Sequence, residues 1–138
     1  AVSKEFIPTY ETTVAAGADL RACIDEPFTL APGERKLVDT GIKLELPIGY
    51  EAQVRPRSGL ANKYGISVVN TPGTIDGDYR GKVMVNLINN GYLPWTCEPG
   101  ERIAQIVIAP YVQGSFIQVD ELSETERGEG GHGSTGTK

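Results

Sequence analysis

An arginine beside a small hydroxyl residue marks the first place in this sequence where chemistry can be expected. Arg57, Ser58 and Gly59 follow an extended run and precede a short helical pattern. The free N–H groups of a first helical turn, together with the forked guanidinium of Arg57, form a site suited to phosphate or another anion. The alternative is an ordinary helix N-cap next to a solvent-exposed arginine.

A turn-rich segment, residues 70–81, supplies a candidate for the activation of water. It contains Asp76, Asp78 and Tyr79 among three glycines and precedes a strand-like run. The chain has a single histidine, His132, which excludes most zinc sites and most Ser-His-Asp or Cys-His schemes. An acid of this segment could therefore activate water as a general base. The alternative is a β-hairpin whose aspartates only stabilise its turns.

Two further polar positions lie on runs with strand character. Asp19 and Arg21 stand two residues apart, on one face of a strand, and are predicted to form a structural ion pair. Gln105 lies near the start of another strand, where its amide faces either a ligand or solvent. Neither position identifies a ligand by itself.

The composition changes abruptly at Arg127. Residues 127–138 contain no apolar side chain and cannot pack into a core, so a disordered tail is one interpretation. The other is an anion cradle of backbone amides with Arg127, Ser134 and Thr135, although the lysine of a P-loop is absent. We therefore expect a folded domain at 1–126 and, after it, a glycine-rich C-terminal arm.

Short strands must position these residues. Glycine and proline recur about every ten residues, and the runs between them are typical of a β-sandwich or barrel. Apolar and polar residues alternate within 51–55 and 83–87, which indicates half-buried strands. The predicted strands are Ala18–Cys23, Phe28–Leu30, Glu34–Asp39, Ile42–Glu45, Tyr50–Pro56, Ile66–Val69, Gly81–Asn89, Trp95–Cys97 and Ile103–Pro110.

One short helix is predicted, with Ser58 as a cap of its first turn and Gly65 as its left-handed end. No long amphipathic helix is present, so doubly wound α/β folds are excluded. The sequence therefore predicts an all-β fold with one short helix.

Composition limits the class of protein. A chain of 138 residues with 39% hydrophobic and 22% charged residues is expected to form one soluble domain, and no apolar run approaches the ~18 residues of a membrane span. The net charge of −5 argues against non-specific nucleic-acid binding. Cys23 and Cys97, without a CxxC spacing, are expected to be reduced thiols in a reducing compartment. We expect a cytoplasmic protein, or a nuclear or organellar one if the source is eukaryotic.

Five segments, in this order, resemble the five motifs of the trimeric dUTPase family. Each is weak alone, but together they extend across almost the whole chain. The segments are Ala16–Ala22, Arg57–Leu60, Gly73–Gly81, Gly100–Gln105 and the tail from Arg127.

The resemblance implies a jelly-roll-like, distorted β-barrel that assembles as a homotrimer. Its three active sites would lie at subunit interfaces, with each arm closing over the site of another subunit. The implied reaction is Mg2+-dependent hydrolysis of dUTP to dUMP and pyrophosphate, which keeps uracil out of DNA and supplies dUMP for thymidylate synthesis. No carboxylate cage is needed, because substrate phosphates and water can supply most of the magnesium shell. Asp19 would contact that ion through water at most.

The resemblance also assigns roles around the nucleoside. Asp76 matches the acid that activates water for attack on the α-phosphorus. Tyr79 matches the ring that packs under the deoxyribose and leaves no room for a 2′-hydroxyl. The uracil edge would be recognised by Asn70 and by the backbone around Gly81 and Val83.

The remaining matches concern the phosphates and the arm. Phosphate contacts are implied for Arg57, Ser58, Gly59 and Gln105. The γ-phosphate would be clamped by Arg127, Ser134 and Thr135. His132, followed by Gly133, stands where the family usually has a phenylalanine that stacks on uracil; an imidazole ring can also stack.

The sequence leaves two rival functions. A dCTP deaminase shares the fold but would need a catalytic glutamate, and residues 75–79 contain none. A non-catalytic nucleotide sensor would have no need for the water-activating acid Asp76. Release of pyrophosphate from dUTP separates the three.

Overall fold

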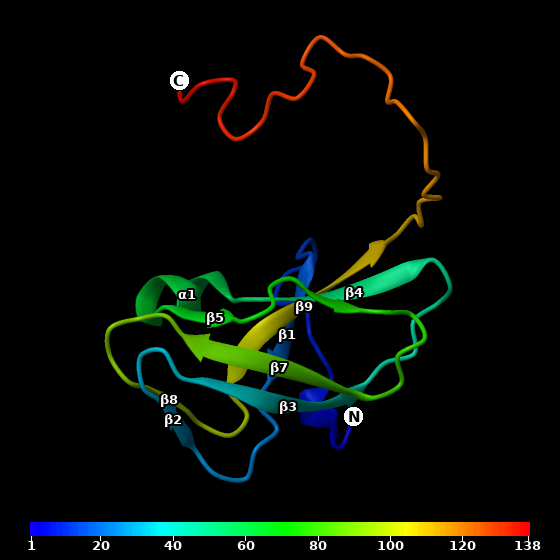
Figure 1. Cartoon of the computed structure of the whole chain (residues 1–138). Coiled ribbons are helices and arrows are strands. Elements are labelled where there is room, and N and C mark those ends of the chain that lie inside the picture. The colour runs from blue at the N-terminus through cyan, green and yellow to red at the C-terminus, as the bar shows by residue number, and fades with distance from the viewer.

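The computed structural model describes residues 1–138, and strands dominate it. A four-stranded sheet has the order β1-β9-β4-β6, a three-stranded sheet the order β3-β7-β5, and β2 pairs with β8 (Figure 1). All strand pairs are antiparallel. The elements are η1 (Lys4–Phe6), β1 (Gly17–Arg21), β2 (Phe28–Leu30), β3 (Arg35–Lys43), β4 (Tyr50–Arg55), α1 (Ser58–Tyr64), β5 (Ile66–Val68), β6 (Gly73–Ile75), β7 (Lys82–Asn89), β8 (Trp95–Cys97) and β9 (Arg102–Pro110).

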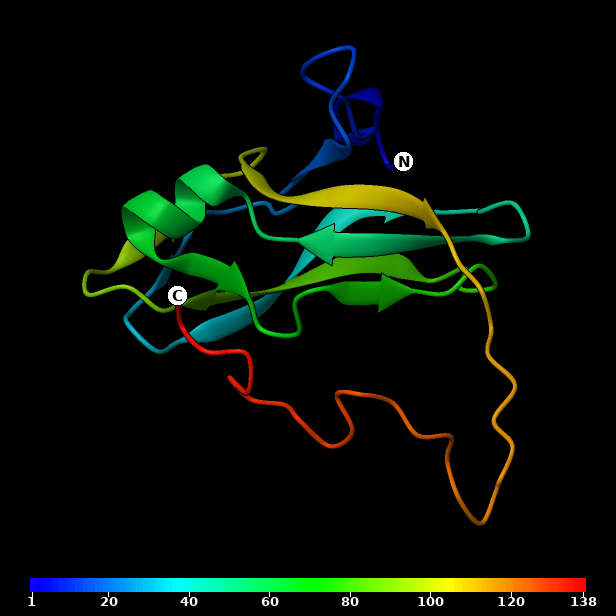
Figure 2. The same ribbon diagram turned by 90° about the horizontal axis from the view of Figure 1, so that it is seen from above.

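The two larger sheets lie face to face with the core between them (Figure 2). Leu20 and Ile106 face inward from one sheet, Val85 and Leu87 from the other, and each is at most 3% exposed. Alternation along β1, β4 and most of β9 then places the polar residues of these strands on the outer face of their sheet. The all-β prediction with one short helix is confirmed. The three sheets do not close into one hydrogen-bonded barrel.

Two predicted strands, Glu34–Asp39 and Ile42–Glu45, form the single strand β3. Gly41 has a φ of 75°, and the register of β3 against β7 shifts between Asp39 and Lys43. A glycine in the left-handed region therefore produces a bulge here rather than a turn.

The segment 70–81 does not form the β-hairpin of the alternative interpretation. It contains a short strand, β6, that pairs with β4, whereas the following strand β7 belongs to the other sheet. Residues 76–81, which we name the crossover loop, therefore carry the chain from one sheet to the other.

The N-cap of helix α1 is one residue earlier than the predicted cap, Ser58. Arg57 is the N-cap residue, no side chain caps the first turn, and Ser58 is the first helical residue. The predicted C-terminus is confirmed, because Gly65 has a φ of 74° and donates its N–H to Ala61. This helix has only seven residues, and no helix of the structure is long and apolar enough to cross a membrane.

Both cysteines are free thiols, as predicted. Burial raises the pKa of the Cys97 thiol to about 12, and burial with the charge of Asp39 raises the pKa of Cys23. Neither thiol is therefore activated as a nucleophile.

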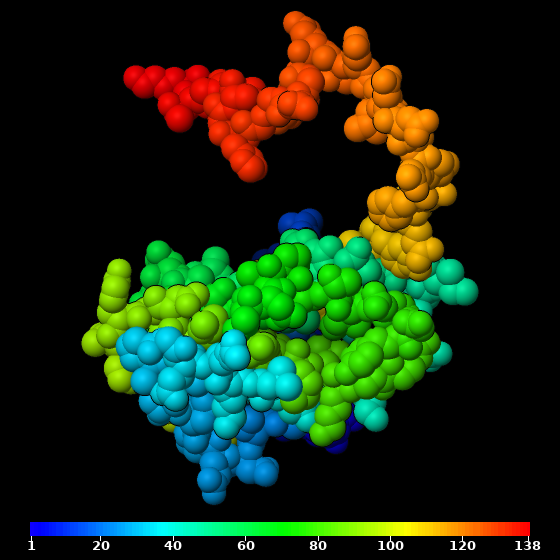
Figure 3. Space-filling model, viewed as in Figure 1, coloured from blue at the N-terminus to red at the C-terminus, as the bar shows by residue number.

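The chain leaves the body of the protein after β9. Residues 111–138 arch away from the two sheets, and almost all of them are exposed (Figures 1 and 3). The first part of this segment is apolar: Tyr111, Val112, Phe116, Ile117, Val119 and Leu122 are exposed by 38% to 100%. The division into a domain at 1–126 and an arm at 127–138 stays a prediction.

Candidate active site

A row of polar side chains crosses the outer face of the four-stranded sheet. Asp19 of β1 is the direct cross-strand partner of Gln105 on β9, and Gln105 is in turn the partner of Arg55 on β4. Directly opposed residues in antiparallel strands have neighbouring side chains. The fold thus brings together two sequence-predicted residues, Asp19 and Gln105, that lie far apart in the chain.

Two arginines converge on Asp19. Arg57 Nε lies 3.4 Å from Asp19 Oδ1, and Arg102 Nη1 lies 3.2 Å from Oδ2. Arg57 also donates from Nη1 to the backbone carbonyl of Arg102 at 3.2 Å. The carboxylate side chain is only 11% exposed, whereas the Arg57 and Arg102 side chains are 28% and 37% exposed. We name Asp19, Arg57 and Arg102 the arginine cluster.

The predicted ion pair between Asp19 and Arg21 is wrong. Arg21 donates from Nη1 to the carbonyl of Gly100 at 2.9 Å instead. Residues two apart on a strand are separated by about 6.6 Å, whereas a cross-strand or loop partner comes closer.

Gln105 is held in place by its surroundings. Its Nε2 donates to the carbonyl of Pro56 at 3.0 Å, just before the first turn of α1. Its Oε1 lies against Gly17, where a Cβ atom would collide with it. Gly17 therefore admits the glutamine side chain, and Gln105 connects β9 to the chain entering α1.

The first turn of α1 adds further donors near the arginine cluster. Ser58 and Gly59 are both exposed, and nothing lies within 4 Å of the position where a Cβ of Gly59 would stand. The absence of a side-chain cap leaves the N–H groups of this turn without a side-chain acceptor. An approaching anion would meet the hydroxyl, the amides and the Arg57 guanidinium together.

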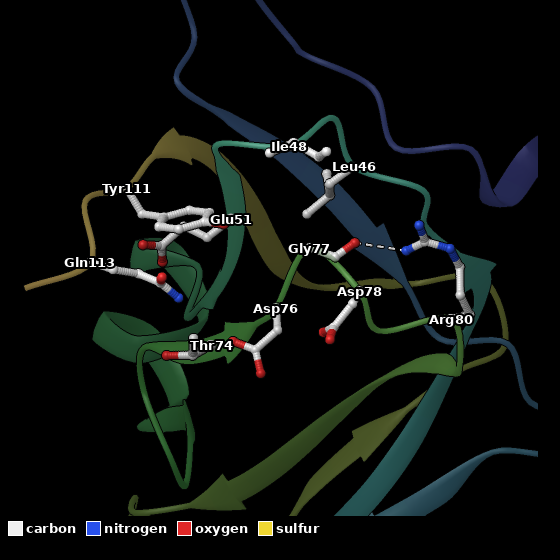
Figure 4. A pocket seen from close by; sticks show the side chains of 10 residues that line it. All are labelled: Leu46, Ile48, Glu51, Thr74, Asp76, Gly77, Asp78, Arg80, Tyr111 and Gln113. Carbon is white, nitrogen blue, oxygen red and sulfur yellow. Dashed lines mark hydrogen bonds between the residues drawn. The ribbon is translucent and has the colours of Figure 1, made fainter.

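The acid predicted to activate water lies in a separate hollow of about 660 Å³. Figure 4 shows the carboxylates of Asp76 and Asp78 on the same side of the crossover loop. The loop is fixed internally, since Tyr79 N donates to the Asp76 carbonyl at 3.1 Å and Arg80 Nη1 to the Gly77 carbonyl at 2.7 Å. The residues that line this hollow are Leu46, Ile48, Glu51, Thr74, Asp76, Gly77, Asp78, Arg80, Tyr111 and Gln113.

Tyr79 lies over Gly81 at the end of the crossover loop. The phenol donates to the carbonyl of Lys82 at 2.8 Å, and a Cβ on Gly81 would collide with the ring. Tyr79 is 45% exposed, so part of the residue remains accessible to a ligand.

The base of the crossover loop is held by an ion pair. Lys82 Nζ lies 2.9 Å from Asp39 Oδ2. Burial raises the pKa of Asp39, but hydrogen bonds from the Gly41 N–H and from Lys82 outweigh it, and the net pKa lies below its ordinary value. The same hydrogen bond and charge raise the pKa of Lys82.

The residues predicted to contact uracil lie on both sides of this loop. Asn70 is exposed, after β5. Val83 is 1% exposed, and its carbonyl accepts the buried hydroxyl of Thr40 at 2.6 Å. Of the predicted uracil contacts, Asn70 and the chain near Gly81 therefore lie at or near the surface, whereas the Val83 carbonyl already accepts a hydrogen bond from Thr40.

The arm residues form local turns, and none of their hydrogen bonds reaches the body. Arg127 Nε donates to the Gly130 carbonyl at 2.6 Å, and Ser134 N donates to the Gly131 carbonyl at 3.0 Å. His132 has a φ of 46° and Gly133 a φ of 88°. Thr135 is exposed as well.

The structure does not bring Asp76 and Arg57 together within one chain. Ile75 pairs with Ala52, and Arg57 lies five residues farther along (52 to 57). At about 3.3 Å per residue this separation is roughly 17 Å. Arg102 and Glu51 were not identified from the sequence. Arg102 contacts Asp19, and Glu51 lines the same hollow as Asp76.

Known proteins are similar to this chain in sequence and in fold. A family model described as dUTPase matches residues 4–136. The deoxyuridine 5′-triphosphate nucleotidohydrolase of Maricaulis maris (strain MCS10) is 58% identical over 134 residues, which cover 96% of this chain and 88% of the relative. The protein of that name from Chlamydia pneumoniae is 60% identical over 131 residues, which cover 94% of this chain and 90% of the relative. A solved structure of a mutant dUTPase of Staphylococcus bacteriophage 80alpha with dUpNHpp matches with a TM-score of 0.86 at 28% identity. The match covers 99% of this chain and 95% of that structure's chain. The chain belongs to the dUTPase family.

Proposed function

We propose that this dUTPase hydrolyses dUTP to dUMP and pyrophosphate through a water that Asp76 activates for attack on the α-phosphorus. The observation that carries this role is the exposed carboxylate of Asp76 in the hollow beside the crossover loop. No histidine stands in that hollow to act as the base in its place. A carboxylate within reach of the attacking water is sufficient for general base catalysis.

The crossover loop would select the nucleoside. The exposed face of Tyr79 packs under the deoxyribose, and a 2′-hydroxyl would collide with the ring. Asn70 and backbone groups near Gly81 and Val83 bind the uracil edge. A cytosine edge would leave those donors and acceptors unpaired, which is the costly kind of mismatch.

The phosphates would be bound by the arginine cluster and its surroundings. Arg57 supplies the charge, while Ser58 and Gly59 supply a hydroxyl and amides that no side chain caps. Gln105 stands beside them, with its amide already oriented by Pro56. Donors fixed before the reaction stabilise charge that develops at phosphorus.

Magnesium would reach this site with the substrate. The structure contains no group of three or more His, Cys, Asp or Glu residues that could hold a metal ion. A site without a cluster of protein ligands fits a Mg2+ ion that is bound mainly by phosphate oxygens and water, because this ion retains several waters. When bound, the ion neutralises phosphate charge. Asp19 would contact it only through water, since an arginine stands next to each of its oxygens.

A complete site needs more than one copy of this chain. Asp76 and Arg57 are separated by roughly 17 Å along the sheet, too far for both to contact one α-phosphate. The exposed apolar residues of 111–122 supply a reason to associate, because soluble monomers rarely leave such a surface uncovered. A closed ring of three copies would place Asp76 of one subunit next to Arg57 of another.

The arm would complete the site from a further subunit. Arg127 with Ser134 and Thr135 would clamp the γ-phosphate, and His132, followed by Gly133, would stack on uracil. The arm brings no apolar area, so its closure depends on these contacts alone.

Pyrophosphate release from dUTP, dCTP, dTTP and UTP, each with Mg2+, tests the proposed function. We expect release from dUTP alone, with dUMP as the other product. The Asp76→Asn protein, purified identically, controls for contaminating phosphatases. Equal release from dCTP, or release of ammonia from it, would contradict the proposal.

A further inference from the structure

We propose that Arg102 is a positioning residue that orients Arg57 towards the substrate phosphates. This inference rests on the proposed role of Arg57. Arg102 holds Arg57 at two points: its backbone carbonyl accepts Arg57 Nη1 at 3.2 Å, and its guanidinium shares Asp19 with Arg57.

The contacts leave one side of the Arg57 guanidinium free. Its Nε faces Asp19 and its Nη1 faces the Arg102 carbonyl. An arginine has five N–H donors, so the pair on Nη2 remains for a phosphate. A flexible side chain is thereby presented in one orientation before the substrate arrives.

Charge balance gives the Arg102 side chain a second effect. Asp19 is largely buried between two cations, each within 3.4 Å of one of its oxygens. Without Arg102, the whole charge of Asp19 would act on Arg57 and compete with phosphate for the guanidinium. Arg102 therefore weakens the hold of Asp19 on Arg57 and favours phosphate binding.

Glu11 provides a matched control for this charge balance. It lies 3.4 Å from the same Arg102 Nη1 but is 59% exposed, so solvent screens the pair. Glu11→Gln changes the charge next to Arg102 and leaves the contacts of Asp19 and Arg57 in place. We expect kcat/KM for dUTP to change by less than about twofold, as for an exposed ion pair.

A double-mutant cycle on kcat/KM tests the inference, using Arg57→Met, Arg102→Met and the combined variant. We expect Arg102→Met to lower kcat/KM for dUTP about 10- to 100-fold, as displaced substrate-binding groups do. In the Arg57→Met background the same change should have an effect below about twofold. Binding of dUpNHpp should weaken in parallel, whereas binding of dUMP should not.

The outcomes are distinguishable. Equal fold effects of Arg102→Met in both backgrounds, or none in either, would overturn the inference while the proposed function stands. An unchanged kcat/KM in Arg57→Met would instead remove Arg57 from the proposed phosphate site. Arg102→Gln, which removes the charge but keeps a polar side chain, provides the cycle if Arg102→Met does not fold, and the same non-additivity with Arg57→Met is expected.

Discussion

The ring of Tyr79 lies so close over Gly81 that no side chain larger than hydrogen fits between them; Cε1 would be 2.8 Å from a Cβ at position 81. Gly81→Ala must therefore displace the ring or the chain. Because the ring is proposed to support the deoxyribose, we expect kcat/KM for dUTP to fall about 10- to 100-fold and discrimination against UTP to weaken.

Gly114→Ala is the matched control for that change, because nothing lies within 4 Å of a Cβ at position 114. Steady-state kinetics with dUTP and UTP on both variants measure the difference. If the Gly81→Ala enzyme discriminates between dUTP and UTP as the parent does, the position of Tyr79 does not set sugar specificity.

Replacement of Asp76 by asparagine tests the base directly. Asp76→Asn preserves the shape of the side chain and removes the proton acceptor. We expect turnover to fall about 10²- to 10⁴-fold, the usual contribution of a general base, with binding of dUpNHpp retained. Single-turnover kinetics and calorimetry give the two quantities. Undiminished turnover would place water activation on another group.

Much of the fold could be predicted from turn chemistry and alternation. Phe28–Leu30 and Trp95–Cys97 occur as predicted, since glycine and proline delimit them. β6 could not be predicted, because its three residues, with a buried glycine at the start, have no alternation to detect. Its pairing with β4 is a long-range contact that local sequence does not encode.

The site was predictable in its residue types but not in its pairings. The motif order identified Asp19 and Arg57 separately, whereas their ion pair depends on how β9 lies between β1 and the strand that leads into α1. Arg21 was paired wrongly with Asp19 for the same reason. Arg102 was missed because an arginine at a strand start gives no local signal of a partner across the sheet.

His132 allows a test of the arm. Its φ of 46° lies in the left-handed region, which glycine adopts freely, so His132→Gly removes the ring without disturbing the backbone. Base stacking contributes about 1–3 kcal/mol, so we expect kcat/KM for dUTP to fall about tenfold or more. His132→Phe retains a ring, and its kcat/KM for dUTP is expected to stay near that of the parent. A parental rate in His132→Gly would mean that the arm closes through its arginine and amides alone.

The low pKa of Asp39 predicts a loss of stability in acid. Its folded-state pKa lies below the unfolded value, so the contribution to stability is present above the unfolded pKa and is lost as pH falls through the folded pKa. We expect the Tm of the parent to fall more steeply than that of Asp39→Asn between about pH 5 and pH 3. Thermal melts across this range compare the two slopes. Parallel slopes would show that Asp39 is not stabilised in its charged form.

Shared active sites are the central claim, and mixed trimers test it most directly. Asp76→Asn and Arg57→Met chains, each nearly inactive alone, are unfolded, mixed in equal amounts and refolded together. If Asp76 and Arg57 of one site come from different subunits, about one quarter of the sites in randomly mixed trimers receive both intact residues, and activity returns to about that fraction. If both residues act within one chain, no mixed site is intact. Activity that stays at the level of the separate variants, in mixtures confirmed by mass to contain both chains, would contradict the account.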